Sequence, residues 1–499
     1  MSENRFVNSI VGPQDAPDVG ATVIAEPASE VMLAPQGDAE WGFFMFPTVW
    51  RLRNGLLVCA VTLGNDEMPS HADYHYLWYV SEDEGEHWTA IVPGLREAES
   101  LVRERQTLPN GRQVYYEPAI LSLDAVDVEP FDFVPEDNVK GCRLFYRLGD
   151  LPEEKRYIRM FSREPDESEW HEGRVTMDPD IIVPAFMEPV IEDDPDLEPT
   201  HSVMATRLRK LFRYIGDDRL PSLGKEEPRT DLGRSFKYKH NNRIGMNIHV
   251  ASTGISPEDI RSELPANIVI RLLLPSPTSA RFHDQTYRPI MAMQDGRLFA
   301  TSFGYHPAQA LRVIKKDEGL DTGYCPNIFK SCDAGWSWQY YSSLPYDLGS
   351  YKLYQAHITP DMPRGNWMAM CRSAPLMLTR SYDDGRTWGM PEAIRPTSVN
   401  PAGGLLPNGV AFRMYGRPGQ YITFCCDGEG KEWGNDMMLV EGAGDPSVEQ
   451  NRNTCANSCT CVTGPDRFVV VYTDYSHRYR GGHRRPAVLA RRVTVRNRR

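Results

Sequence analysis

Short runs of apolar and aromatic residues, many alternating with polar ones, recur along the chain and predict β-strands. Examples are YLWYV at 76–80, NIFK at 327–330 and LMLTR at 376–380. Each run is followed by a short polar stretch and then by a second strand-like run, TAIVPG, QYYSSLP or GMPEAI. The 39 Gly and 39 Pro interrupt the pattern often, which is typical of many short strands joined by turns. The sequence therefore predicts an all-β protein.

The polar stretch between the paired strands is a repeat. SEDEGEHW (81–88), SCDAGWSW (331–338) and SYDDGRTW (381–388) carry Ser, Asp, Gly and Trp at the same offsets. Looser copies are FSREPDESEW (161–170) and FCCDGEGKEW (424–433). An Asp side chain accepts hydrogen bonds from its own turn, a Gly allows a positive φ, and a Trp buries a large ring. We therefore predict that the repeat fastens a β-hairpin and has no catalytic role of its own.

A second recurring phrase consists of a strand, a tight turn at NG, DG or PD, and another strand. It occurs in FPTVWRLRNGLLVCAV, YRPIMAMQDGRLFATS, GLLPNGVAFRMY and TCVTGPDRFVVVYTD. The two phrases together make a four-stranded unit, and 50 residues separate Asp333 from Asp383 while 44 separate Asp383 from Asp427. Repeated units of this length predict the blades of a β-propeller. The expected fold is a six- or seven-bladed β-propeller of four-stranded antiparallel blades.

The domain organisation follows from these units. We expect a flexible N-terminus at 1–20 and a single propeller domain at 21–495. Blades are expected near 41–97, 114–178, 286–350, 351–395, 396–445 and 454–495. The segment 200–280 is either a seventh blade or an insertion, and it contains a long polar loop at 216–243. The strand-like piece ATVIAEPASEVMLAP is expected to join the last blade and close the ring, which would remove exposed sheet edges.

The S-x-D-x-G-x-T-W repeats resemble the Asp boxes of the sialidase (neuraminidase) superfamily, and the resemblance spans roughly residues 40–495. It implies a central funnel on the face away from the boxes, lined by the starts of inner strands and the loops between blades. Sialidases use three arginines for the substrate carboxylate, an Asp acid/base and a Tyr nucleophile paired with a Glu. By position, two of the arginines fall on Arg372 and Arg417, and Met45 stands at the other. Asn457 stands near the tyrosine position, and Leu353–Tyr354 near the glutamate position.

Glycoside hydrolysis usually needs two carboxyl groups, one on each side of the scissile bond. Asp73 lies in a first-blade loop together with His71, which can act as a base near neutral pH. Glu117 directly precedes Pro118 at a strand start. Glu117 occupies the position that Arg288 occupies in TYRPIMAM, so we expect both to face the same axis from different blades. These residues are the candidates for catalysis and for binding an acidic group.

A uronate lyase would instead need a Tyr/His pair beside an arginine. Tyr354 and His357, in KLYQAHITP, could supply it if His357 begins an inner strand; otherwise His357 hydrogen-bonds within the sheet. Trp41 and Tyr116 could stack on a sugar face or could be buried core aromatics. Arg372 and Arg417 could bind an acidic substrate by bidentate pairing or could form ion pairs between blades.

Composition excludes several classes of function. The net charge of −13 argues against a nucleic-acid partner, because phosphate binding needs a basic surface. The basic stretch HRYRGGHRR (477–485) could contact an anion, although a solvated turn is the default expectation. No apolar run resembles a signal peptide or a membrane span, so we expect a cytoplasmic protein with its ten Cys as free thiols. No cofactor motif and no zinc-type cysteine spacing is present.

The sequence thus predicts a carbohydrate-active enzyme of the sialidase superfamily, an exo-acting glycoside hydrolase whose oligosaccharide substrate binds in a central funnel. Two alternatives stay open. One is a lyase that cleaves uronic-acid linkages by β-elimination, and the other is a non-catalytic propeller that binds carbohydrate. The 216–243 loop could cover the funnel or contact a second copy of the chain, so a homo-oligomer also stays open.

Overall fold

The structure is a computed structural model of the chain. It describes residues 12–16, 20–33, 44–64, 76–117, 120–122, 128, 145–189, 268–277, 279–281, 284–287, 290–304, 306, 313–315, 319–321, 325–344, 351–355, 367–371, 376–395, 399–416, 419–428, 430–440, 453–454, 456–478, 482 and 484–497.

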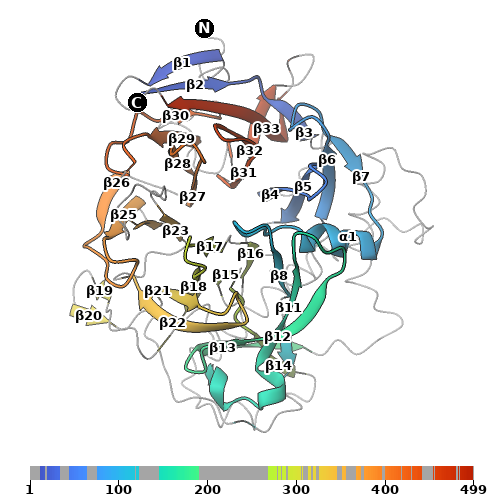
Figure 1. Cartoon of the computed structure of the whole chain (residues 1–499), viewed down its shortest axis with the longest axis vertical. Helices are drawn as coiled ribbons and strands as arrows, with labels where there is room; N and C mark the ends of the chain where they lie inside the picture. The colour runs from blue at the N-terminus through green and yellow to red at the C-terminus, as the bar shows by residue number, and fades with distance from the viewer. Residues whose placement is uncertain are drawn as a thin grey trace.

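The described residues form an all-β protein, as predicted. One α-helix, α1 (Leu95–Arg103), and two 3-10 turns, η2 (Leu148–Asp150) and η3 (Glu153–Lys155), are the helical elements of the described part of the chain. Figure 1 shows the β-sheets one beside the next around a common centre.

Three sheets are four-stranded antiparallel meanders, each within one predicted unit. The first contains β4 (Phe44–Arg51), β5 (Leu57–Gly64), β6 (Tyr76–Ser81) and β7 (Thr89–Ile91). The second contains β23 (Tyr351–Gln355), β24 (Trp367–Cys371), β25 (Leu376–Ser381) and β26 (Glu392–Arg395). The third contains β27 (Val399–Leu405), β28 (Ala411–Gly416), β29 (Gln420–Cys425) and β30 (Met437–Met438).

The two ends of the chain share one sheet. It contains β31 (Ser458–Val462), β32 (Arg467–Arg478) and β33 (Arg484–Asn497), together with β1 (Gly12–Ala16), β2 (Ala21–Ala25) and β3 (Ser29–Leu33). Both β2 and β3 pair antiparallel with β33. This confirms that the N-terminal strands join the last sheet. Residues 12–16 of the segment expected to be flexible form β1, which pairs with β2, and residues 1–11 lie outside the described part of the chain.

The predicted separation of blades 114–178 and 286–350 is wrong, because one sheet contains strands of both. Its strands are β8 (Gln113–Glu117), β11 (Tyr157–Arg163), β12 (His171–Met177), β15 (Ser279–Arg281), β16 (Asp284–Tyr287), β17 (Met291–Ala292), β18 (Leu298–Gly304), β21 (Cys325–Ser331) and β22 (Ser337–Ser343). The junction is a parallel pairing of β12 with β22. Gly173 makes it sterically feasible, since a Cβ there would lie 2.3 Å from the Trp336 ring.

A further sheet combines segments that are far apart in the sequence. It contains β10 (Phe145–Arg147), β13 (Ile182–Pro189), β14 (Ile268–Leu273) and β9 (Ile120–Ser122). β14 falls within the segment 200–280, which we expected to be a seventh blade or an insertion, and the loop 216–243 lies outside the described residues. β19 (Val313–Lys315) and β20 (Gly319–Asp321) form a separate hairpin.

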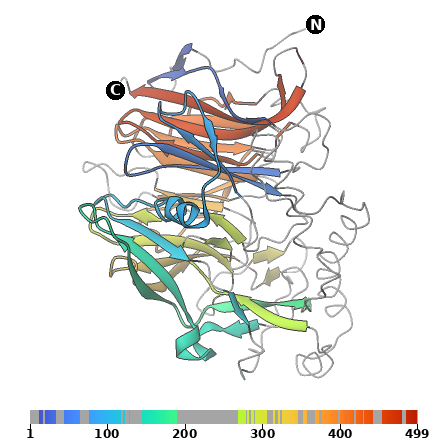
Figure 2. The same cartoon turned by 90° about the vertical axis from the view of Figure 1, so that its right-hand side faces the viewer.

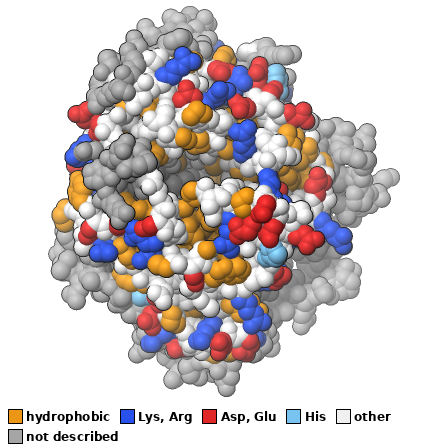
Figure 3. All heavy atoms as spheres, viewed as in Figure 1, with side chains coloured by type: hydrophobic (Ala, Val, Ile, Leu, Met, Phe, Trp, Pro, Cys, Tyr) orange, Lys and Arg blue, Asp and Glu red, His pale blue; other side chains and the backbone are white. Residues whose placement is uncertain are grey.

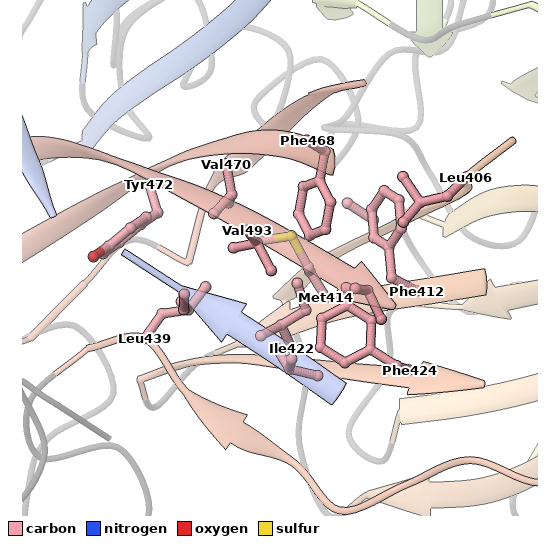
Figure 4. Packing of buried hydrophobic residues seen from close by; sticks show 14 of the residues in the cluster. Leu406, Phe412, Met414, Ile422, Phe424, Leu439, Phe468, Val470, Tyr472 and Val493 are labelled. Carbon is pink, nitrogen blue, oxygen red and sulfur yellow. The ribbon is translucent and has the colours of Figure 1, made fainter. Parts of the chain in front are cut away.

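Buried side chains pack between neighbouring sheets, and between the two halves of the nine-stranded sheet. In the largest such interface, Phe412 of β28 stacks on Phe468 of β32 with ring centroids 4.5 Å apart (Figure 4). The other interfaces are Val469 with Val49, α1 with Trp50 and Phe161, Tyr116 with Trp338, Phe299 with Trp367, and Met370 with Tyr415. Full burial of an aromatic or aliphatic side chain contributes about 1.5–3 kcal/mol, so these interfaces provide most of the stability.

The repeat identified in the sequence folds as predicted, as a hydrogen-bonded turn. In 381–388, the Ser381 hydroxyl donates to Asp383 Oδ1 at 2.7 Å and accepts from Gly385 N at 2.8 Å. Asp383 also accepts from Thr387 N at 2.9 Å and from Thr387 Oγ1 at 2.6 Å. Trp388 Nε1 donates to Gly385 O at 3.1 Å. We call this arrangement a repeat turn; the segments 81–88 and 331–338 have the same bonds.

A fourth repeat turn is built with a cysteine in place of the serine. Cys425 Sγ donates to Asp427 Oδ1 at 3.0 Å, and the same oxygen accepts from Gly430 N at 2.8 Å. Trp433 Nε1 donates to Gly430 O at 2.7 Å, as the other repeat tryptophans do. Each of the four turns follows the third strand of its unit, and local hydrogen bonds therefore define it independently of the rest of the sheet.

The repeat turns also bind the neighbouring sheets. Each glycine carbonyl of the three regular turns accepts a second hydrogen bond from a hydroxyl of an adjacent sheet or, for Tyr116, of the other half of the nine-stranded sheet. The pairs are Ser29 with Gly85, Tyr116 with Gly335, and Ser342 with Gly385, at 2.7, 3.1 and 2.5 Å. Arginines that start the second strands reach the same turns, for example Arg467 to Glu84 at 2.7 Å and Arg297 to Asp384 at 3.1 Å. Figure 3 shows acidic and basic side chains next to one another around a hollow.

These contacts give the sheets two distinct ends. In the β23–β26 sheet, Gln355 lies opposite Trp367, which lies opposite Ser381, so the end of β23 is on the side of the repeat turn. The inter-sheet arginines place the repeat turns of neighbouring sheets on that same side. We call it the turn face and the opposite end of the strands the loop face. β33 crosses between the two sides and ends beside the C-terminus in Figure 2.

Candidate functional site

The loop face is the candidate site because most predicted residues adjoin strand ends there. Arg372 follows Cys371, the end of β24 farthest from Ser381, and Arg417 follows Gly416 at the corresponding end of β28. Asp73 and His71 fall between the end of β5 and the start of β6, and Trp41 precedes β4. The residues Asp73, His71, Trp41, Arg288, Arg372, Arg417 and His357 lie outside the described part of the structure, so their roles stay predictions.

Glu117 is the predicted catalytic residue whose surroundings are described. β8 begins next to Arg112, which donates to Ala334 O of a repeat turn at 3.2 Å, so Glu117 at its other end lies on the loop face. The Glu117 carboxylate forms an ion pair with Arg159, which lies opposite it on β11. The Glu117 side chain is 34% exposed and the Arg159 side chain 48%. The sequence predicted a carboxylate here and missed its partner.

Arg159 connects two carboxylates. Its Nη1 lies 3.3 Å from Glu172 Oε1, on the diagonal neighbour across β11 and β12. Burial alone would lower the pKa of Arg159, but the charges and hydrogen bonds of Glu117 and Glu172 raise it, so the guanidinium stays charged. Since Arg159 stands between the two carboxylates, they hold the arginine and are not arranged as an acid/base pair across a substrate bond.

Tyr116 belongs to the core, which corrects its assignment as a sugar-stacking residue. Its side chain is 1% exposed and lies edge-on to Trp338, with ring centroids 6.2 Å apart. Its hydroxyl donates to Gly335 O at 3.1 Å. Burial raises the pKa of the Tyr116 phenol well above its ordinary value. The alternation along β8 puts Tyr116 on the face toward β22, in the other half of the same sheet, and Glu117 on the opposite face.

Tyr354 does not adjoin the loop face. Tyr354 lies opposite Met368 in β23, one residue from the strand end on the turn face, and its side chain is outside the described residues. β23 ends at Gln355, and His357 lies outside the described residues, so its role stays a prediction. The hairpin register separates Tyr354 from Glu117, which spacing in the sequence could not reveal.

A buried histidine–aspartate pair escaped the sequence analysis. His306 Nε2 lies 3.3 Å from Asp178 Oδ1, and the His306 ring stacks on Tyr340 with centroids 4.1 Å apart. Asp178 Oδ2 accepts from Tyr340 N at 2.8 Å. Burial alone would raise the pKa of Asp178. The hydrogen bonds from His306 and from the Tyr340 backbone lower this pKa by more, so the pKa of Asp178 lies below its ordinary value. His306 is 4% exposed, so solvent has little access to the pair, and we interpret it as a structural link between β12, β18 and β22. No motif in the sequence predicted this pair.

Within the described residues, no group of three or more His, Cys, Asp or Glu side chains converges as a metal site. Cys59, Cys332, Cys425, Cys426, Cys459 and Cys461 are free thiols. Burial raises the pKa of Cys425 and of Cys461 to about 12. In the described ranges, no helix combines the length and the apolar character needed to cross a lipid bilayer.

Comparisons with known proteins give structural similarity at low sequence identity. No family model and no curated protein matches the chain. A Dyadobacter fermentans protein of unknown function is 13% identical, with a TM-score of 0.44, over 96% of this chain and 100% of that chain. The NanB sialidase of Streptococcus pneumoniae is 12% identical, with a TM-score of 0.41, over 94% of this chain and 70% of that chain. The Trypanosoma rangeli sialidase is 8% identical, with a TM-score of 0.38; the match covers 97% of this chain and 59% of that one, which is less than two thirds of it.

Proposed function

We propose that the sheets close into a six-bladed β-propeller, to which the β9–β10–β13–β14 sheet is an addition. The support is the order of the interfaces. The six units are the three four-stranded meanders, the two halves of the nine-stranded sheet and the sheet of the chain ends. Each unit packs against the next, and the last packs against the first. β2 and β3 pair with β33 of the last unit, and β4 of the first unit is the next strand along the chain, so the first unit is tethered to the last. An experimental structure in which these units do not share one axis would refute this proposal.

We propose further that the loop face of this propeller is the active face of an exo-acting glycosidase of the sialidase superfamily, with hydrolase chemistry. The observation that carries the proposal is the division of the sheets into two ends. Repeat turns occupy one end, and the half-exposed carboxylate of Glu117 lies at the other. This is the arrangement that the resemblance to the Asp-box proteins implies.

Each residue of the proposed site has a role. Glu117 is one of the two carboxyl groups, and Arg159 holds it in a fixed orientation. Asp73 would be the second carboxyl group, because Arg159 stands between Glu117 and Glu172 and these two therefore cannot face each other across a substrate bond. Arg372 and Arg417 would bind an acidic group of the substrate through paired hydrogen bonds. The two carboxyl groups would act as acid and as base or nucleophile.

A glycoside panel with a matched pair of variants tests the proposal. Methylumbelliferyl glycosides and acidic oligosaccharides are assayed both for new reducing ends and for unsaturated products. Glu117→Gln should lower kcat by about 100-fold or more, because the loss of a general acid or base has that effect. Glu172→Gln, which also loses a contact to Arg159, should retain nearly full activity.

The outcomes separate the alternatives. A reducing end without an unsaturated product identifies a hydrolase, whereas an unsaturated product would identify the lyase. The register of β23 gives the lyase less support, since it puts Tyr354 near the turn face. If no substrate is turned over but a glycan binds, the chain is a carbohydrate-binding propeller, and if Glu117→Gln is fully active, Glu117 has no catalytic role.

A further inference from the structure

A β-bulge in β22 re-aims one aromatic side chain. The register of the β21–β22 pairing shifts, and Tyr341 is the extra residue on β22. A bulge of this kind redirects side chains, and here both Tyr341 and Ser342 turn toward the β23–β26 sheet. Ser342 Oγ donates to Gly385 O at 2.5 Å, so β22 is fastened to a repeat turn of the next sheet right beside Tyr341.

Two cations lie against Tyr341, whose ring packs edge-on against Phe299 with centroids 5.2 Å apart. Lys330 Nζ lies 5.5 Å from the centroid of the Tyr341 ring. Arg386 Nε donates to the Tyr341 hydroxyl at 3.3 Å. Because the hydroxyl oxygen accepts this bond, its own proton can be donated elsewhere, as can those of Lys330 Nζ and of the two Nη atoms of Arg386. Three donor groups therefore surround one tyrosine.

The positive charge beside this tyrosine has no acidic partner in the described part of the chain. There, the side-chain contacts of Lys330 and of Arg386 are those with Tyr341, and no carboxylate lies at ion-pair distance from either cation. In this they differ from Arg297 and Arg467, which link neighbouring sheets through carboxylates at 3.1 and 2.7 Å.

The acidic side chains in the repeat turn of Arg386 are bound to other donors. Asp383 accepts from Thr387 N at 2.9 Å and from Thr387 Oγ1 at 2.6 Å. Asp384 forms an ion pair with Arg297 at 3.1 Å. Since these bonds define the turn and its contact with the neighbouring sheet, the two carboxylates stay in place and leave the charge of Arg386 for a ligand.

This group of residues lies on the turn face. Lys330 directly precedes Ser331, where one repeat turn begins, and Arg386 lies inside the repeat turn 381–388. Glu117 lies on the loop face, at the opposite ends of the strands. The inference drawn from the group therefore goes beyond the proposed function and does not depend on it.

We propose that Lys330, Tyr341 and Arg386 bind a tetrahedral oxyanion, the sulfate or phosphate group of a small ligand. Four acceptor oxygens on one centre suit an ammonium, a guanidinium and a hydroxyl donor at the same time, and hydrogen bonds between charged groups are the stronger ones. A neutral ligand would leave both cations without a counter-charge. A free inorganic anion and a sugar sulfate or phosphate ester share this chemistry, and the assay distinguishes them.

Binding assays with the full chain test this inference. Calorimetry measures Kd for sodium sulfate, sodium phosphate, glucose 6-sulfate and glucose 6-phosphate, with glucose and sodium acetate as reference probes at equal ionic strength. The test variant is Lys330→Gln/Arg386→Gln. The matched control, Lys155→Gln/Arg96→Gln, also removes one half-buried lysine and one exposed arginine. Tyr341→Phe removes the hydroxyl alone, and circular dichroism checks the fold of every variant.

We expect the tetrahedral oxyanions to bind with Kd of about 1 mM or lower, acetate to bind more weakly and glucose not to bind. The Lys330→Gln/Arg386→Gln variant should raise Kd at least about tenfold, and Tyr341→Phe should raise it about tenfold, because a hydrogen bond to a charged group is lost. The control should match the parent chain.

Three results would overturn the inference: no binding of any tetrahedral oxyanion, an unchanged Kd in Lys330→Gln/Arg386→Gln or in Tyr341→Phe, and an equal loss of affinity in the control. Tighter binding of the esters than of the inorganic anions would support the inference with a sugar ester as the ligand. Equal Kd values for esters and inorganic anions would support it with a free anion as the ligand.

Discussion

The contact between Tyr116 and Gly335 allows the packing of a repeat turn to be tested quantitatively. Gly335 has φ +95°, and its carbonyl accepts from both Tyr116 Oη at 3.1 Å and Trp338 Nε1 at 3.0 Å. Tyr116→Phe removes the first bond and leaves the second, so no buried acceptor is left without a donor. The cost should therefore be that of one net hydrogen bond, about 1 kcal/mol in the free energy of unfolding.

Gly335→Ala should cost considerably more, for two separate reasons. A left-handed backbone conformation costs an alanine about 1–2 kcal/mol. In addition, the new Cβ would lie 2.2 Å from Tyr116 Oη, and such overpacking costs about 1–3 kcal/mol. We therefore expect a total loss of about 3 kcal/mol.

The double variant separates the two reasons. Without the hydroxyl, the nearest neighbour of the new Cβ is Tyr116 Cζ at 3.5 Å, an ordinary contact. In the Tyr116→Phe background, Gly335→Ala should thus cost only the backbone strain of about 1–2 kcal/mol. Urea unfolding followed by tryptophan fluorescence gives all four free energies, and Tyr382→Phe, at an exposed position, is the control. If the effects of Tyr116→Phe and Gly335→Ala were additive, the contact between the Tyr116 hydroxyl and Gly335 would be refuted. An equal loss of unfolding free energy in Tyr382→Phe would refute it too.

Three further predictions concern the repeat turns. Burial raises the pKa of Asp83, but hydrogen bonds from His87 and its own turn lower it to about 2, so its stabilising effect is complete above about pH 4 and is lost as the pH falls toward 2. Asp83→Asn should weaken the decline of the urea midpoint with acidification, and an unchanged decline would contradict this. Cys425→Ser should leave the urea midpoint unchanged or slightly higher, because a serine hydroxyl makes the same hydrogen bond in the other turns. Cys425→Ala should lose about 1 kcal/mol of unfolding free energy. A destabilised Cys425→Ser variant would show that the cysteine does not take the place of the serine in this turn. Arg297→Gln should lose about 1 kcal/mol, less at high salt, since it breaks an ion pair between sheets, and thermal unfolding at two salt concentrations measures this.

Local features of the fold could be predicted from the sequence because their causes are local. In the three regular repeat turns, the hydrogen bonds within the turn connect residues no more than four positions apart, as from Thr387 to Asp383, so the residues of the motif are sufficient to specify it. Strand runs and the pairing of ATVIA with the last sheet were also correct, because alternating apolar residues need a partner sheet. The three four-stranded meanders follow from hairpins whose strands are adjacent in the sequence.

The candidate site was predicted less well than the fold. Glu117 was identified as a carboxylate at a strand end. For its neighbour Tyr116 the sequence left both sugar stacking and a core position open, since one position decides which side of a sheet a residue occupies, and the structure puts Tyr116 in the core. Tyr354 was grouped with the candidate site because the register of β23, which puts it near the turn face, could not be read from its composition. Boundaries of short strands depend on pairing, which a single segment does not specify.

The sequence by itself determined that the chain is all-β, where its turns lie and which hydrogen bonds close them. Only the tertiary structure decided that β12 and β22 merge two units, that Arg159 stands between Glu117 and Glu172, and that His306 meets Asp178. The physical reason is the distance along the chain between the residues that interact. Turns and strands are set by neighbours within a few residues, whereas the packing of one sheet on another depends on side chains far apart in the chain, whose shapes become complementary only after the strands have paired.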